Sequence, residues 1–118
     1  MLTIPSSQQQ PSAQLIAERA ARLLIEFPSL ASVSGMAARV SRAQHMAEAG
    51  TIFEIRPGVF SIRSESNPLG TYEVDTNAHT CTCPASAKFP GPCKHRLAVA
   101  LYAGWPAKPG ALPFALPV

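Results

Sequence analysis

Apolar residues in the first half of the chain recur at helical spacing. Residues 12–27 have apolar positions three or four apart, which predicts an amphipathic helix that Pro28 would end. A second helix is predicted at about residues 34–49, with Gly50 suited to the left-handed position after it. The first apolar face consists of Ile16, Ala20, Leu23, Leu24 and Phe27. The second consists of Met36, Ala37, Val40, Ala43 and Ala47.

The spacing changes from helical to alternating after residue 50. In TIFEIRPGVFSIRS, residues 51–64, apolar and polar positions alternate on both sides of Pro57-Gly58, a pair typical of a tight turn. The alternation continues in GTYEVD and HTCTC after further turns. This pattern predicts an antiparallel meander of three or four strands. A last helix is predicted to begin near Cys93 or Lys94 and to end at Gly104.

These elements predict a small α+β protein in which N-terminal helices pack on an antiparallel β-meander and a C-terminal helix. We divide the chain into a disordered N-terminus (1–11), a helical segment (12–50), the meander with the last helix (51–104) and a Pro-rich tail (105–118). In the tail, Trp105 and Phe114 are candidates to fold back on the core. A chain of 118 residues buries a modest core, so a bound metal would add substantially to its stability.

The sequence also indicates where the protein works. No apolar run reaches the ~18 residues that a membrane span needs. The first ten residues lack the basic start and apolar core of a signal peptide. We therefore expect a cytoplasmic protein with no membrane contact, in a compartment where thiols stay reduced. There, clustered cysteines bind metal more often than they form disulfides.

All three cysteines lie close together, in the pattern Cys81-x-Cys83, nine residues, Cys93-x-His95. Two residues apart on a strand, Cys81 and Cys83 project to the same side. Cys93 falls at a predicted helix start, where exposed backbone N–H groups favour a thiolate. His95 adds a neutral nitrogen. These four side chains suit a tetrahedral structural zinc site, with one Zn²⁺ as the cofactor.

Other interpretations explain this cluster less completely. A disulfide would leave one thiol unpaired in a reducing compartment. A cysteine–histidine nucleophile uses one cysteine of three, and the zinc-deaminase pattern lacks its His-x-Glu and Cys-x-x-Cys. We expect His79 and His45 to be surface residues and not ligands. Since four protein ligands leave no open coordination position, we expect no catalytic residues and no enzymatic activity.

The segment YEVDTNAHTCTCPASAKFPGPCKHRLAVAL resembles a SWIM-type zinc finger, a family with the pattern Cys-x-Cys, variable loop, Cys-x-His. Cys81, Cys83, Cys93 and His95 match the four ligand positions. The proline after the second cysteine and the apolar helix after CKH fit as well. The resemblance covers about residues 59–103. A weaker similarity extends back to the helix SRAQHMAEAG, which is seen in small bacterial proteins of this kind. It implies a ββα-like zinc finger and a role in contact with DNA or protein.

Charge is uneven along the chain. Residues 1–75 carry six basic and seven acidic side chains, for a net charge of −1, whereas residues 76–118 carry four basic and no acidic ones, for +4. Three of these cations, Lys88, Lys94 and Arg96, flank the cysteine cluster. They are candidates for contact with nucleic-acid phosphates. They could equally offset the negative charge of three thiolates around Zn²⁺.

The sequence therefore predicts a non-enzymatic zinc-binding module that contacts DNA, another nucleic acid or protein, without a small-molecule substrate. One alternative is a protein–protein adaptor subunit that never touches nucleic acid. Another is a winged-helix arrangement over residues 12–63, with the hairpin as the wing and Arg39 and Arg42 on the recognition helix. Outside that arrangement, we expect these two arginines to be solvated.

Overall fold

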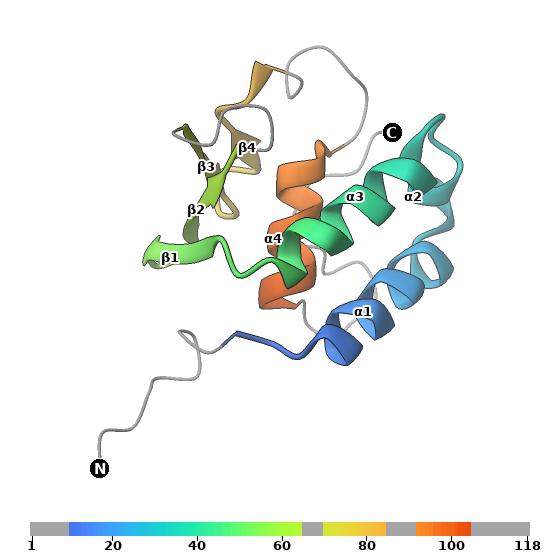
Figure 1. The fold of residues 1–118 in the computed structure, drawn as a ribbon. Coiled ribbons are helices and arrows are strands. Elements are labelled where there is room, and N and C mark those ends of the chain that lie inside the picture. The colour runs from blue at the N-terminus through green and yellow to red at the C-terminus, as the bar shows by residue number, and fades with distance from the viewer. Residues whose placement is uncertain (1–9, 65–69, 85–91, 105–118) are drawn as a thin grey trace.

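The computed structural model describes residues 10–64, 70–84 and 92–104. The chain forms helices α1 (Ala13–Glu26), α2 (Pro28–Ala31) and α3 (Met36–Glu48), strands β1 (Ile52–Arg56), β2 (Val59–Arg63), β3 (Thr71–Asp75) and β4 (Thr80–Cys81), and helix α4 (Lys94–Ala103). Helix α4 lies between the sheet and the pair formed by α1 and α3 (Figure 1). The predicted α+β fold, with N-terminal helices, meander and C-terminal helix, is confirmed.

The N-terminal helices follow the apolar pattern closely. Helix α1 begins after Ser12, whose hydroxyl accepts a hydrogen bond from the Leu15 N–H, and it buries one apolar face. Pro28 ends α1 but also occupies the first turn of α2, where its missing N–H costs nothing. In α3 the expected stripe is buried except for Ala37, which is exposed, while Met46 is buried in addition.

The four strands form an antiparallel meander in the order β1-β2-β3-β4. The register pairs Ile62 with Ile52 on one side and with Tyr72 on the other. One face of the sheet joins the core through Ile52, Phe60, Ile62 and Val74. Edge strand β1 also leaves two large apolar side chains in contact with solvent, since Phe53 is 61% exposed and Ile55 is 48% exposed.

Helix α4 is buried on nearly all sides. Of its ten residues, seven are buried, from His95 to Tyr102 with Arg96 as the exception. The helix contacts α1 and α3 on one side and β3 and β4 on the other. A helix that is apolar around its whole circumference belongs in a protein interior. The C-terminal helix is therefore the centre of the core and not a surface appendage.

One hydrophobic cluster links both predicted segments, since it contains residues of α1, α3, the sheet and α4. The boundaries drawn from the sequence, including the one at residue 50, stay predictions. Trp105, Phe114 and the first nine residues lie outside the described residues. None of the described helices is both long enough and apolar enough to cross a membrane.

Candidate metal centre

The four predicted ligands come from the two halves of a strand–loop–helix unit. Cys81 ends β4, which pairs with β3 through Val74. Cys83 follows just after the strand, in a bend and not on the strand itself. Cys93 is the residue before the first turn of α4, and His95 lies within that turn. The structure brings together all four residues, although nine others separate the two pairs in the sequence.

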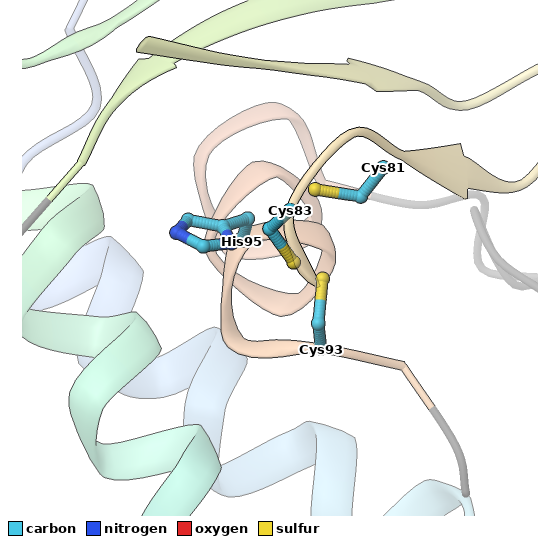
Figure 2. A group of neighbouring side chains, drawn as sticks. All are labelled: Cys81, Cys83, Cys93 and His95. Atoms are coloured by element: carbon cyan, nitrogen blue, oxygen red, sulfur yellow. The ribbon is translucent and has the colours of Figure 1, made fainter. Parts of the chain in front are cut away.

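The ligand atoms converge on one small volume. The three sulfurs and a His95 ring nitrogen all lie within 4.8 Å of one another. Figure 2 shows the Cys83 and Cys93 sulfurs turned toward each other, with Cys81 and His95 on either side. Around a tetrahedral zinc ion with Zn–S bonds of about 2.3 Å, two sulfurs lie under about 4 Å apart. Small side-chain rotations are therefore enough to close the four atoms around one ion.

Burial of these polar groups also fits a metal. Cys83 and Cys93 are each 5% exposed and His95 is 3% exposed. Both ring nitrogens of His95 are buried and have no hydrogen-bond partner among the described residues. An unpartnered polar atom in an interior is costly. A bond from one nitrogen to a metal ion would remove that cost at one of the two atoms.

The thiols interact strongly. The pKa of Cys93 is lowered to about 3, chiefly because the Cys81 thiol hydrogen-bonds to the Cys93 thiolate. The same hydrogen bond, together with burial, raises the pKa of Cys81. One thiolate is thus favoured while its neighbour holds a proton. Zn²⁺ supplies the positive charge that lets several adjacent thiols ionise together.

Arg96 interacts electrostatically with the cysteine cluster. Burial of its guanidinium lowers its pKa, whereas the charges of Cys93, Cys81 and Cys83 act in the opposite direction. This attraction supports the view that Arg96 offsets the negative charge of the thiolates. Lys94 is half-buried, and Lys88 lies outside the described residues. Contact of these three residues with nucleic acid stays a prediction.

Two residues outside the predicted set also support the ligands. Tyr72 on β3 packs against the ring of His95, with centroids 4.6 Å apart. Arg39 on α3 donates a hydrogen bond from Nη1 to the carbonyl oxygen of Pro92, at 3.0 Å. The expectation of a solvated Arg39 is therefore corrected, because α3 packs beside α4. Sequence spacing offered no signal for either contact, since each joins elements far apart in the chain.

The remaining candidates behave as expected. His79 and His45 are both exposed, and neither belongs to the converging group. His79 has a φ of 58°, in the left-handed region, and lies in the turn before β4. Arg42 is exposed on α3. Among the described residues, the converging group therefore consists of the Cys-x-Cys and Cys-x-His residues.

Residues 66–104 match the family model of the SWIM zinc finger. This chain contains a SWIM zinc finger. The match covers about a third of the chain and includes all four converging residues. No curated protein and no solved structure matches the chain. The SWIM finger and its Cys81, Cys83, Cys93 and His95 cluster are suited to hold one zinc ion, so the protein contains a zinc-binding module.

Proposed function

We propose that this protein is a non-enzymatic module whose SWIM finger contacts nucleic acid, with DNA as the first candidate. The observation that carries this proposal is the convergence of four buried protein ligands. Four side chains complete a tetrahedral zinc shell, so neither water nor a substrate has a position on the metal. Zinc held in this way stabilises the surrounding surface and takes no part in a reaction.

The charge of the finger favours a polyanion as the partner. Residues 76–118 contain four basic side chains and no acidic one. Lys88 lies between the two ligand pairs, and Lys94 begins α4 directly after Cys93. Cations held near a metal-fixed backbone lose less conformational entropy on binding than cations on a mobile chain. Phosphate contacts by such cations would position the protein without reading the base sequence.

The proposal is tested by fluorescence anisotropy with labelled duplex DNA, single-stranded DNA and RNA of mixed sequence. We expect an affinity that falls steeply between low and physiological salt, because bound cations release counterions from the phosphates. The double variant Lys88→Glu/Lys94→Glu should weaken binding to every sequence while keeping its zinc. Arg42→Glu, an exposed charge reversal on α3, is the matched control. A parent protein that binds none of these probes at low salt would contradict the proposal.

A protein adaptor is the second candidate, favoured by the exposed apolar face of β1. Phe53 and Ile55, two residues apart on β1, are 61% and 48% exposed. Large exposed apolar side chains that lie side by side are typical of protein contact sites. A pull-down from the source cell, with and without nuclease, separates direct partners from those bridged by nucleic acid. Phe53→Ser should abolish only direct partners if this face binds them.

The winged-helix alternative has less support. The order of α1, α2, α3 and the β1–β2 hairpin is compatible with it. However, Arg39 is engaged with the Pro92 carbonyl, which leaves Arg42 as the exposed arginine on α3. If Arg42→Glu weakens DNA binding and the Lys88→Glu/Lys94→Glu variant does not, the winged-helix surface, and not the zinc finger, is the DNA-binding site.

The proposal also includes a cytoplasmic location in a bacterium. In the cytoplasm thiols stay reduced, as zinc binding requires.

A further inference from the structure

A hydrogen bond connects the N-terminal helices to the zinc ligands. Arg39 on α3 reaches across to the carbonyl oxygen of Pro92, the residue before Cys93, with a distance of 3.0 Å from Nη1. Arg39 lies outside the matched residues 66–104, and 53 positions separate it from Pro92. We propose that Arg39 is a positioning residue of the zinc centre, which fixes the backbone that presents Cys93.

The contact lies where the backbone enters helix α4. Cys93 is the N-cap residue of α4, with extended angles of φ −72° and ψ 167°. Its carbonyl accepts the first helical hydrogen bond, from the Leu97 N–H at 3.1 Å. The Pro92 carbonyl precedes the helix and has no place in that ladder, and Pro92 has no N–H to donate. Arg39 therefore satisfies a carbonyl that the helix itself cannot.

This one peptide unit orients half of the ligand set. Cys93 follows it directly, and His95 lies two residues later in the first turn of the helix. A rotation of the Pro92–Cys93 peptide would move the Cys93 sulfur relative to Cys81 and Cys83. Metal sites need ligand atoms held within about 0.5 Å of their productive positions. A guanidinium that holds this carbonyl from a packed helix restricts such a rotation.

The contact lies in a well-packed part of the molecule. The Pro92 side chain is fully buried, and α3 packs along α4. Arg39 therefore extends from a packed helix to a buried proline, and the length and direction of the hydrogen bond between them are well defined. Arg42 lies on the same helix three residues later but is exposed. The two arginines therefore form a matched pair for experiment. They share the residue type and the helix, and Arg39 is the one that hydrogen-bonds to the Pro92 carbonyl.

The experiment uses the full chain with Arg39→Met, Arg39→Lys and Arg42→Met. Methionine keeps the unbranched aliphatic part of the side chain and the helix propensity but removes the donor. Zinc affinity is measured by competition with a chromophoric chelator, and ligand geometry by the absorption bands of the Co²⁺-substituted protein. We expect Arg39→Met to bind zinc about 10-fold more weakly or worse, and to change the Co²⁺ bands. Arg42→Met should match the parent, and Arg39→Lys, with a single-point donor, should lie between.

Three results would overturn the proposal. One is an Arg39→Met protein with a lower melting temperature but parental zinc affinity and Co²⁺ bands, which would mean that Arg39 only joins two helices. Another is an equal loss in Arg39→Met and Arg42→Met. If Arg39→Met does not fold, Arg39→Lys decides the question. Parental zinc affinity and parental Co²⁺ bands in that variant would show that the guanidinium does not set the geometry.

Discussion

The ring of Tyr72 on β3 lies 4.6 Å from the ring of His95 on α4, centroid to centroid, with the planes tilted by 51°. Metal-binding histidines are usually oriented by a hydrogen bond from the second ring nitrogen. His95 has no such partner among the described residues. Tyr72 therefore orients the ligand by packing, and it does so from the strand next to the one that ends in Cys81.

Removal of the Tyr72 ring should loosen this ligand. We expect Tyr72→Ala to lower the stability of the zinc-bound protein by at least about 1 kcal/mol, because it loses an aromatic pair and part of the covering of His95. Tyr72→Phe keeps the ring and should behave like the parent. Thermal unfolding and the zinc dissociation rate are the measurements. Equal zinc dissociation from Tyr72→Ala and Tyr72→Phe would show that the ring does not hold His95.

Zinc binding should release protons. Cys81 holds its proton in the metal-free cluster, because its pKa is raised by the hydrogen bond to Cys93 and by burial. Zinc needs the thiolate, so that proton must leave, and zinc affinity should rise with pH through the neutral range. Calorimetric titration of metal-free protein in buffers of different ionisation heat measures the release. We expect saturation at one equivalent of zinc. A reaction heat that does not change with the buffer would contradict the release of protons.

Loss of the zinc site should destabilise the whole described fold. Cys83→Ser removes a ligand, and the binding free energy of a structural zinc is also folding free energy. We expect a fall in melting temperature of more than about 10 °C, since each kcal/mol corresponds to several degrees in a chain of this size. Zinc-free parent protein is the control and should melt like the variant.

The N-terminal helix should respond as well. Helix α1 contacts α4 and shares its hydrophobic cluster, so we expect α1 to lose protection together with α4 after Cys83→Ser. Amide hydrogen exchange of residues 13–26 measures this. Full protection of α1 in a zinc-free protein would mean that the helical segment folds independently of the finger.

Arg19 should stabilise the other end of α4. Its Nη1 donates to the carbonyl oxygens of Leu101 and Tyr102, at 2.8 and 2.9 Å, in the last turn of that helix. A cation at a helix C-terminus satisfies carbonyls that the helix leaves open. Since the side chain is only partly buried, we expect Arg19→Met to cost about 1–2 kcal/mol.

Arg22 provides the matched control for Arg19 on the same helix. It pairs with Glu26 four residues later, on a solvated surface. An exposed pair of this kind contributes little, so Arg22→Met should leave the melting temperature nearly unchanged. Equal effects of the two substitutions in thermal unfolding would contradict the role assigned to Arg19.

The sequence predicted those features that depend on local periodicity. The three long helices, the meander and the convergence of Cys81, Cys83, Cys93 and His95 follow from spacing, and the structure confirms them. The orientation of β1 did not follow, because Ile52, Phe53 and Ile55 make both of its faces apolar. Which face is buried depends on the helices opposite, and only the fold reveals that.

Contacts between segments far apart in the chain also could not be predicted from the sequence. Nothing in the local pattern around Arg39 distinguishes it from the exposed Arg42, since both occupy the polar side of one helix. The difference comes from the position of α4, which places the Pro92 carbonyl within reach of one arginine. Pairing of β3 with β4 likewise decides that Tyr72 covers His95.

The burial of α4 has a practical consequence for work on the isolated finger. A peptide cut at the matched boundaries, residues 66–104, would keep all four ligands but lose α1, α3 and the strands β1 and β2. Its helix would then present Leu97, Val99 and Leu101 to water, although all three are fully buried in the intact chain. Such a peptide should self-associate even when zinc is bound. Solubility, and not metal affinity, would limit its use as a minimal unit.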